Sequence, residues 1–390
     1  MLFFELLYCF LVFTDIPAIK NLREAFIETA LSTMSHHWLA TSFFPAYMVQ
    51  DIQTRMEAMQ LSQVGENSQR PTPTSPGDNG ASGTSAETGP SVPEDYTTED
   101  AFYDLFWELN RTSFEEYLEE HPETLDNGWE NIYINEAGLN DHGTTIYTSM
   151  GEQVLAIDVP NRLLLVRVTG TGYLGVLAIG KDPAQLRCEA SEGIGSYGQS
   201  MDKLVSYNDG VIGMTGSGFY DPEGNGNGGI IAGYTMCEGK NYGVHYAEQG
   251  YKRIELTKDN KMYIIDSFAP VAEDVTDAVE FSPALVIDGE LMVGGFYDWN
   301  GINPRACIGQ SESGEILMLV IEGRLIGRSI GTDVETCADI LMKHKAYTAI
   351  NLDGGTSAVM WYDGEYVTKC SNSNISSRYL PNAWVYGNYE

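Results

Sequence analysis

A polar segment that runs from Leu61 to about Asp95 divides this 390-residue chain into two unlike parts. The segment consists mainly of Ser, Thr, Pro, Gly, Asn and Glu, and it has almost no apolar side chains. Such a composition cannot bury enough apolar surface to offset the entropy that is lost on ordering. We therefore predict a disordered Ser/Pro/Gly linker over residues 61–98, which is either the spacer of a tethered protein or a simple linker between domains.

The part before the linker begins with an apolar stretch, residues 1–13, in which Glu5 is the single charged residue. A bilayer crossing needs about 20 apolar residues and a signal peptide has a basic beginning, so the stretch completes neither pattern. We predict that residues 1–60 comprise the remnant of a membrane anchor and membrane-proximal helices, with a buried amphipathic start as the alternative. A tethered chain would lie at the extracellular face of the cell membrane, and an untethered one would be secreted.

The chain is strongly acidic, with 55 acidic residues against 22 basic ones and a formal net charge of -33. A surface of this sign repels the phosphates of nucleic acids and the head groups of anionic lipids. We therefore exclude nucleic-acid binding and polybasic membrane binding. An anionic substrate would need a local basic pocket. Residues 99–130 are predicted to form an acidic helical segment.

From about Asn131 onward, short apolar runs with branched residues indicate strands, and Asp-Gly pairs at 288–289 and 363–364 indicate hairpin turns. One helix is predicted near 332–345, where Thr332 and Glu335 fit a capping box. We expect an α+β fold: a strand-rich mixed-sheet domain with few helices over residues 131–390, preceded by the N-terminal helical segment and the flexible linker.

The six cysteines are far apart in the sequence and lack the close pairs that typify zinc sites. Buried free thiols and long-range disulfides both fit this spacing, so the cysteines do not identify the compartment. We assign no metal site and expect no cofactor. The oligomeric state stays open.

The segment NLDGGTS, residues 351–357, directly follows a short apolar run that is typical of a buried strand. Gly354 and Gly355 allow a sharp turn whose N–H groups can converge on an anion, with Asp353 at its mouth. The alternative is that Asp353 only caps a tight turn through its side chain. A second glycine-dense loop at 213–229 is predicted to shape a cleft, with a weak resemblance to a calcium loop as the alternative.

Two arginines stand out in a chain that has few cations. Arg305 and Arg324 each occur where an apolar strand meets turn residues. A guanidinium presents a fixed fork of donors that matches phosphate or carboxylate oxygens, although either arginine alone could serve a structural salt bridge. Together with Asp353 and the glycine-rich turns, they predict a basic pocket that contains a carboxylate.

The ordered set of motifs from residue 205 to residue 388 resembles the phosphodiester glycosidase family, which includes the enzyme that uncovers mannose 6-phosphate and bacterial exopolysaccharide biosynthesis proteins. The matching motifs are GFYDPEG at 218–224, PRACIGQ at 304–310, VIEGRLIGRSIG at 320–331, NLDGGTS at 351–357 and SRYLPNAW at 377–384. Two positions depart from the family pattern. Thr356 replaces a third glycine, and Thr215 stands where the family usually has an asparagine.

The resemblance implies a hydrolase that cleaves a sugar from a glycosyl-1-phosphodiester, on cell-surface or exopolysaccharide glycans. The partner would be a glycosyl phosphodiester or a phosphate-bearing polysaccharide. A non-catalytic module that binds sugar phosphate or assembles polysaccharide is the alternative.

The resemblance and the chemistry of these residues together predict the site residues. The catalytic ones would be Asp353, Arg324 and Arg305, with Asp353 as base or nucleophile and the arginines holding the phosphate. Either Asp221 or Glu322 could supply a second carboxylate. The substrate-binding residues would be Tyr220, Ser329, Gly354, Gly355, Thr356, Ser357, Arg378 and Asn382.

Overall fold

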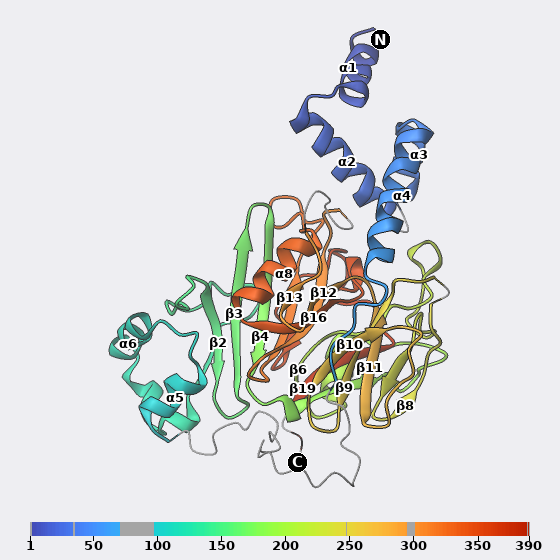
Figure 1. The fold of residues 1–390 in the computed structure, drawn as a ribbon. Coiled ribbons are helices and arrows are strands. Elements are labelled where there is room, and N and C mark those ends of the chain that lie inside the picture. The colour runs from blue at the N-terminus through green and yellow to red at the C-terminus, as the bar shows by residue number, and fades with distance from the viewer. Residues whose placement is uncertain are drawn as a thin grey trace, which may run out of the picture.

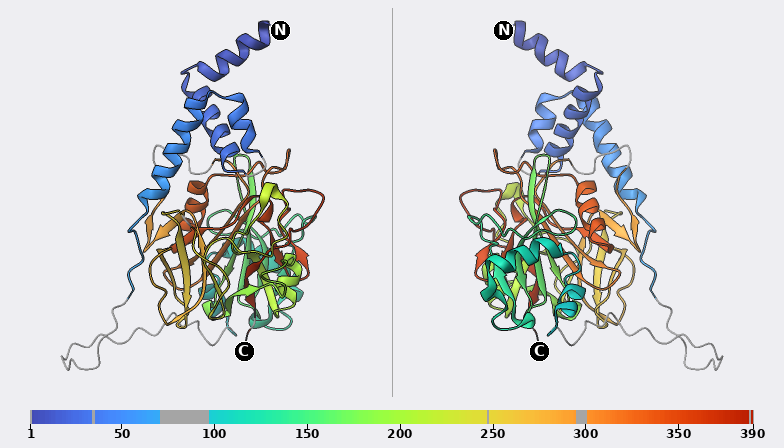
Figure 2. Two further views of the ribbon diagram at one scale, coloured as in Figure 1. Left: turned by 90° about the vertical axis from the view of Figure 1, so that its right-hand side faces the viewer. Right: turned by 90° about the vertical axis from the view of Figure 1, so that its left-hand side faces the viewer.

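The computed structural model describes residues 2–33, 36–70, 97–246, 248–294, 301–387 and 389. Figure 1 shows a body of strands with a group of N-terminal helices standing above it, and Figure 2 shows the same arrangement from two sides. Within the described residues the strands form three sheets, and every printed pairing between named strands is antiparallel. The predicted strand-rich α+β class is confirmed.

The largest sheet has nine strands and runs through the centre of the body. Continuous apolar runs such as Leu163–Val166 and Ile316–Ile321 form its middle, as expected for strands that are buried on both faces. In order across the sheet, the strands are β1 (Tyr133–Asn135), β2 (Gln153–Asp158), β3 (Leu163–Gly170), β4 (Tyr173–Gly180), β15 (Ile316–Ile321), β14 (Arg305–Ser311), β16 (Ala346–Asn351), β12 (Ala284–Ile287) and β13 (Glu290–Leu291).

Two five-stranded sheets complete the body. The first has the order β10 (Met262–Asp266), β9 (Lys252–Thr257), β11 (Val275–Phe281), β7 (Thr235–Cys237) and β8 (Lys240–Asn241). The second has the order β18 (Glu365–Tyr366), β17 (Met360–Tyr362), β6 (Gly210–Thr215), β19 (Asn382–Gly387) and β5 (Leu186–Ala190).

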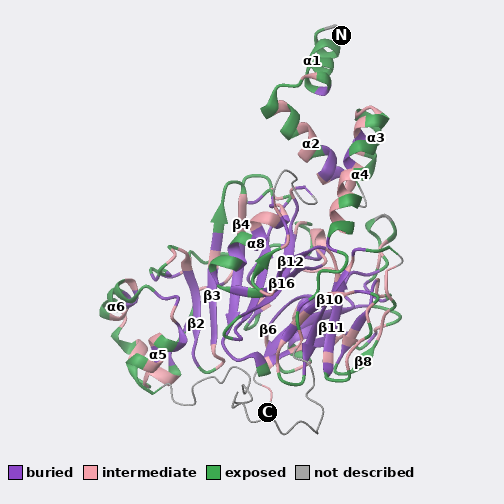
Figure 3. Cartoon of the chain, viewed as in Figure 1, coloured by how far each residue is buried: buried purple, intermediate pink, exposed green. Residues whose placement is uncertain are grey.

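The side chains of the nine-stranded sheet alternate between two cores. Along β3, Leu164 and Val166 face a core that includes helix residues, whereas Leu163 and Leu165 face a core shared with both smaller sheets. This alternation is the period of two that a pleated strand imposes. Figure 3 accordingly shows the central strands as buried. The body is therefore layered, with helices on one face of the large sheet and the smaller sheets on the other.

The helices of the body are short. They are α5 (Glu99–Leu105), α6 (Arg111–Glu120), α7 (Met201–Ser206) and α8 (Val334–Lys343), with short 3-10 turns η1 (Pro122–Leu125), η2 (Trp129–Asn131), η3 (Pro183–Gln185), η4 (Pro222–Gly224) and η5 (Gly355–Ser357).

The start of α8 differs from the predicted capping box. Asp333 is the N-cap, and its side chain accepts a hydrogen bond of 2.7 Å from the N–H of Thr336. Thr332 cannot take this place because its backbone is paired with that of Asn303 in an isolated bridge. The helix therefore begins one residue later than a cap at Thr332 would place it.

The N-terminal helices are α1 (Leu2–Phe13), α2 (Pro17–Leu31), α3 (His37–Phe43) and α4 (Ala46–Ser62). Helices α2, α3 and α4 share a small apolar core that is built from Ile27, Ala30, Ala40, Val49 and Ile52. In the described part of the chain, no helix combines the length and the apolar character that a bilayer crossing requires. The predicted membrane anchor and the division of the chain into four units stay predictions.

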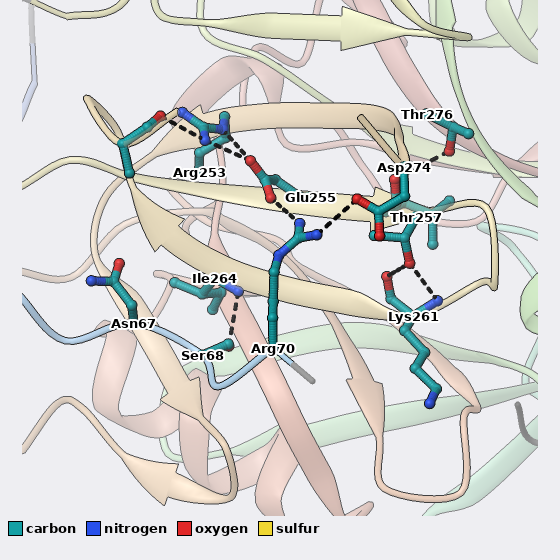
Figure 4. Close-up of polar contacts among 12 residues, drawn as sticks. Asn67, Ser68, Arg70, Arg253, Glu255, Thr257, Lys261, Ile264, Asp274 and Thr276 are labelled. Atoms are coloured by element: carbon teal, nitrogen blue, oxygen red, sulfur yellow. Dashed lines mark hydrogen bonds and ion pairs between the residues drawn. The ribbon is translucent and has the colours of Figure 1, made fainter. Parts of the chain in front are cut away.

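Residues 63–70, which we call the strap, pack along β10, although their composition placed them in the linker. The backbone N–H of Ser68 donates to the carbonyl of Ile264 at 2.8 Å, and the N–H of Ile264 donates to the Ser68 hydroxyl at 3.0 Å. Figure 4 shows Arg70 reaching between Glu255 and Asp274. Polar residues can therefore be ordered by edge-strand and ion-pair contacts without apolar burial. The rest of the predicted linker, from residue 71 to residue 96, lies outside the described residues.

A buried ion cluster joins the segment between α5 and α6 to the large sheet. The Nζ of Lys181 lies 2.6 Å from the carboxylate of Glu108 and 2.9 Å from that of Glu315, and the lysine side chain is buried. Although burial alone would raise the pKa of Glu315, the charge and hydrogen bond of Lys181 lower it to about 2. One cation thus holds two carboxylates inside the protein.

We expect Lys181→Met to lower the free energy of unfolding by about 3–5 kcal/mol, because it leaves two buried carboxylates without their cation. Glu315 stabilises the wild-type fold fully above its ordinary pKa of 4.5, and this stabilisation is lost as the pH falls toward about 2. The deficit of the variant should therefore shrink on acidification. Urea unfolding at pH 7 and at lower pH measures both effects. Lys240→Met, on the exposed strand β8, is the matched control, and equal midpoints for the two variants would contradict the assignment.

Candidate active site

The predicted site residues meet in one large cavity of about 1040 Å³. Its lining includes all three predicted catalytic residues and five of the predicted substrate-binding ones: Arg305, Arg324, Asp353, Gly354, Gly355, Thr356, Ser357 and Arg378. The structure therefore brings together residues that are far apart in the sequence. Their roles stay predictions.

The register of the central strands explains why Arg305 and Asp353 come together. Cys307 on β14 pairs with Asn351 on β16, and the N–H of Leu352 donates to the carbonyl of Ala306 at 2.8 Å. In an antiparallel pair, residue numbers rise along one strand as they fall along the other. Arg305 at the start of β14 therefore lies opposite Asp353, just after β16. The two residues consequently leave the sheet at the same edge.

Arg305 is buried and holds the backbone around it. Its Nε donates to the carbonyl of Thr332 at 3.0 Å, and one terminal nitrogen donates to the carbonyl of Gly301 at 2.6 Å. Burial lowers the pKa of Arg305, but an arginine stays protonated in a protein. Arg305 thus fixes two loops and adds positive charge to the cavity wall.

Arg324 is more open to the cavity than Arg305. One of its terminal nitrogens donates to the side-chain oxygen of Asn303 at 2.8 Å, and its backbone has a φ of 58°, which is uncommon for a residue other than glycine. Desolvation and the nearby charge of Arg305 lower the pKa of Arg324. No carboxylate in the described residues lies within ion-pair distance of Arg324. A guanidinium that faces a cavity and has no carboxylate partner among the described residues can bind an anion.

Asp353 lies at the mouth of the glycine turn, where burial raises the pKa of its carboxyl to about 6. A hydrogen bond with Ser357 and the charge of Arg378 oppose this effect, whereas the charge of Asp221 adds to it. The pKa of this carboxyl thus lies above the ordinary range of an aspartate. A group of this kind suits acid–base or nucleophilic chemistry.

The glycine turn itself is tightly packed. A Cβ at Gly354 would lie 2.7 Å from the carbonyl oxygen of Pro304, and Gly355 has a φ of 60°. The N–H of Gly355 donates to that same Pro304 carbonyl, and the N–H of Ser357 donates to Gly354. Two of the amides that were expected to face an anion are thus engaged inside the protein, which leaves those of Gly354 and Thr356 as candidates.

Both departures from the family pattern make contacts near this turn. The hydroxyl of Thr215 is buried and donates to the carbonyl of Ser357. The hydroxyl of Thr356 accepts a hydrogen bond of 3.1 Å from Ser371. Each threonine therefore helps to hold the turn in place.

Arg378 and Asp221 form a two-point ion pair at 2.6 and 2.7 Å that joins the 213–229 loop to the C-terminal segment. Burial alone would raise the pKa of Asp221, but the hydrogen bond from Arg378 lowers it. Asp221 and Asp353 thus line one cavity with pKa values that are displaced in opposite directions. Opposite displacement of two carboxyl pKa values is typical of sites in which one carboxyl acts as an acid or base and the other stays ionised.

Other predicted site residues do not line the cavity. Tyr220 is 63% exposed on the outside of its loop. Ser329 is buried, and its hydroxyl donates to the carbonyl of Glu322 at 2.5 Å. Asn382 is buried beneath the loop and accepts from the N–H of Ser217 at 2.8 Å. Ser329 and Asn382 therefore support the surrounding loops instead of facing the cavity.

Glu322 also lies elsewhere. Its carboxylate accepts hydrogen bonds of 2.5 and 2.9 Å from Arg328, and both residues line a separate cavity of about 240 Å³. Asp221 is thus the better placed of the two candidates for a second carboxylate.

Two contributors to the cavity were not predicted from the sequence. Asn303 orients Arg324, and its position directly before the PRACIGQ motif was the signal that could have identified it. The N-terminal helices supply a further wall that includes Ser32, Gln53 and Gln60. This wall could not be predicted from the sequence, because no motif connects these helices to the body.

We expect the two arginines to differ in their effect on stability. Arg305→Ala removes donors from buried carbonyls and should cost about 1–3 kcal/mol or more, whereas Arg324→Ala should cost less than about 1 kcal/mol. Thermal unfolding of both variants beside the wild type measures the difference. Equal losses would show that Arg324 belongs to the scaffold and is not held for a ligand.

Residues 208–386 match the family model described as phosphodiester glycosidase. No curated protein matches the chain. Similar solved structures include the zebrafish N-acetylglucosamine-1-phosphodiester alpha-N-acetylglucosaminidase catalytic domain, described as auto-inhibited by its pro-peptide. It is 14% identical, with 58% of this chain and 82% of that chain covered and a TM-score of 0.46.

Two further structures are similar at the same level. A hypothetical protein from Synechocystis is 11% identical, with coverages of 60% of this chain and 63% of that chain and a TM-score of 0.42. A putative exported protein from Burkholderia pseudomallei is 13% identical, with coverages of 55% and 74% and a TM-score of 0.42. The resemblance predicted from the sequence is confirmed by the family match: over residues 208–386 the chain carries the sequence pattern of the phosphodiester glycosidase family.

Proposed function

We propose that this protein is a hydrolase that releases a sugar from a glycosyl-1-phosphodiester and leaves a phosphomonoester. One observation carries the proposal: Arg324, which has no carboxylate at ion-pair distance among the described residues, lines the same cavity as Asp353. In a protein of net charge -33, a local pair of guanidinium groups is the feature that makes a phosphodiester a suitable ligand. The family match supports the same reaction class.

In this proposal, Arg324 contacts the phosphate directly and Arg305 acts mainly by position and charge. Arg305 already donates to the carbonyls of Gly301 and Thr332, so some of its guanidinium N–H groups are used within the protein. Arg324 keeps one terminal nitrogen on Asn303 and is held in the cavity by that bond. Cationic groups placed in advance stabilise the charge that the phosphate gains as it leaves.

The bond that breaks joins the anomeric carbon to the phosphate oxygen, and its electron pair stays with the phosphate. Water supplies the oxygen that replaces it at the anomeric carbon. Asp353 either takes the proton from this water or first forms a glycosyl ester that water then hydrolyses. Because a phosphodiester is a good leaving group, protonation of the leaving oxygen is less demanding than in an ordinary glycoside. Asp221, kept ionised by Arg378, supplies negative charge for the oxocarbenium-like transition state.

We expect Asp353→Asn to lower kcat by about 10²–10⁴-fold, because the amide can act neither as base nor as nucleophile. In the wild type, kcat/KM should rise with pH through about 6, since Asp353 is active when ionised and burial places its pKa there. Release of free sugar from a panel of glycosyl phosphodiesters measures both quantities. Asp100→Asn, on a carboxyl that is 95% exposed, is the matched control.

Arg324→Ala tests the phosphate contact in the same assay. We expect a loss in kcat/KM of at least about 10²-fold, with Arg187→Ala as a control that removes a surface arginine. Full activity of Asp353→Asn would overturn the mechanism. Tight binding of the phosphodiesters by a wild-type protein that releases no sugar would instead favour a non-catalytic binding module.

We also propose that the protein works on cell-surface or exopolysaccharide glycans, with its N-terminus at the outer face of the membrane or the chain secreted. The apolar side chains of α1 support a surface attachment, since Phe3 and Phe4 are 71% and 73% exposed. The net charge of -33 predicts that such attachment favours zwitterionic lipids over anionic ones. Co-sedimentation with the two kinds of vesicle tests this, with Phe3→Ser/Phe4→Ser as the variant. Unchanged partitioning of that variant would contradict it.

A further inference from the structure

Two thiols that the proposed function does not use lie side by side beneath the 213–229 loop. The Sγ atoms of Cys188 on β5 and Cys237 at the end of β7 are 3.1 Å apart, and both side chains are buried. We propose that these two cysteines form a disulfide bond when the chain folds in an oxidising compartment. The bond would join the two five-stranded sheets, and it does not depend on the proposed reaction.

A single carboxylate holds the backbones of the two cysteines in position. The Oδ1 atom of Asp277, on β11, accepts hydrogen bonds from the N–H of Cys188 at 3.2 Å and from the N–H of Glu238 at 2.9 Å. Glu238 directly follows Cys237, so the same oxygen atom fixes the backbone beside each sulfur. A disulfide forms without movement of the backbone only where the two side chains already converge. These hydrogen bonds therefore keep the cysteines where the bond can form.

The surroundings of the two sulfurs suit a disulfide better than a pair of thiols. Apart from each other, their hydrogen-bond partner among the described residues is Nδ2 of Asn382, which lies 3.2 Å from Cys188 and 3.8 Å from Cys237. An amide nitrogen only donates, whereas each thiol has a hydrogen of its own to donate. In the reduced pair, one S–H group can point at the other sulfur, which leaves the second S–H group without an acceptor. The disulfide has no S–H group to satisfy.

Burial determines when the bond forms. It raises the pKa of the Cys188 thiol, and the adjoining Cys237 adds to this effect. Because the thiolate is the attacking species in disulfide exchange, such a thiol reacts slowly once it is enclosed. The bond would therefore form while the strands are still accessible, and the fold would then protect it from reductants. This is the behaviour of a structural disulfide and not of a redox switch.

The oxidant is a disulfide of a small thiol or of a thiol oxidoreductase. One cysteine, as its thiolate, attacks a sulfur of that disulfide and displaces a thiolate, which gives a mixed disulfide. The second cysteine, also as its thiolate, attacks the cysteine sulfur of the mixed disulfide and displaces the other thiolate. Two electrons pass from the cysteine pair to the oxidant, and the two displaced thiolates take up the protons that the cysteines lose. The products are one disulfide in the protein and two reduced thiols.

The cysteine pair is connected to the loop that carries Asp221. The Nδ2 of Asn382 also donates to the Ser217 hydroxyl at 2.9 Å, and that hydroxyl shares a hydrogen bond of 2.6 Å with Thr235, two residues before Cys237. The two cysteines are 49 residues apart, and the segment between them contains the whole loop. Closing a segment of this length lowers the entropy of the unfolded chain. A bond at this place would therefore stabilise the folded loop.

Peptide mapping of the full-length protein tests the bond directly. The protein is folded with oxidised and reduced glutathione, unfolded in guanidinium with iodoacetamide to cap free thiols, and digested with trypsin. Cleavage after Arg187, Lys203 and Lys240 places the two cysteines in adjacent peptides, 188–203 and 204–240. We expect one linked species that lacks two hydrogen atoms relative to the sum of these peptides and that separates on reduction. Two capped peptides, or either cysteine linked to a different one, would overturn the proposal.

Thermal unfolding measures what the bond contributes. The oxidised wild type should unfold about 5–15 °C above the wild type that is folded and heated with a phosphine reductant. Cys188→Ala/Cys237→Ala should lose this difference whatever its own stability, because both conditions are measured on the same variant. Cys307→Ala is the matched control, since Cys307 is buried and hydrogen-bonded to another cysteine, Cys337, and it should keep the difference. A difference of full size in the double variant would contradict the proposal, as would its loss in Cys307→Ala.

Discussion

The antiparallel register of β14 with its two neighbours is the constraint on which the candidate site depends. It sets Arg305 opposite Asp353 on one side and opposite Ile321 on the other, three residues before Arg324. Because all three strands are buried, a slip by one residue would exchange every inward and outward side chain. The hydrophobic cores on the two faces of the large sheet therefore fix the position of the charged groups at its edge. Stability and site geometry have the same origin here.

The charge distribution shows how a strongly acidic chain can accommodate an anion. Desolvation and the nearby charge of Arg305 lower the pKa of Arg324, and this unfavourable proximity persists because backbone carbonyls hold Arg305 and the side chain of Asn303 holds Arg324. Opposite them, Asp353 is desolvated, while Asp221 forms an ion pair with Arg378 that favours its ionised form. The cavity thus contains a cationic side and a carboxylate side, an arrangement that matches a phosphate next to a developing positive charge on a sugar.

The sequence allowed the strand-rich class and the convergence of Arg305, Arg324 and Asp353 to be predicted. Scarce cations at positions where apolar strands meet turn residues are a local signal that can be read without knowledge of the fold. Ser329 and Asn382 show the limit of such signals, since each lies in a matching motif but is turned into the protein to hold a loop. Whether a polar side chain points into a cavity or into the scaffold is decided by tertiary packing. Residues 63–70 were predicted to be disordered because of their polar composition. Backbone pairing and the ion pairs of Arg70 nevertheless order this segment, although it buries no apolar side chain.

The strap has a mechanical consequence. If the chain is pulled from its N-terminus, the load passes through α4 into the hydrogen bonds and ion pairs that connect residues 63–70 with β10. These contacts lie on the outside of a smaller sheet, whereas the strands beside Arg305 and Asp353 are clamped between two cores. The strap would consequently separate from the body first, and the cavity would then lose the wall that the N-terminal helices supply, while the charged edge of the large sheet kept its shape. A force on the N-terminus therefore acts on the weaker strap contacts before it acts on the stronger pairing of the large sheet.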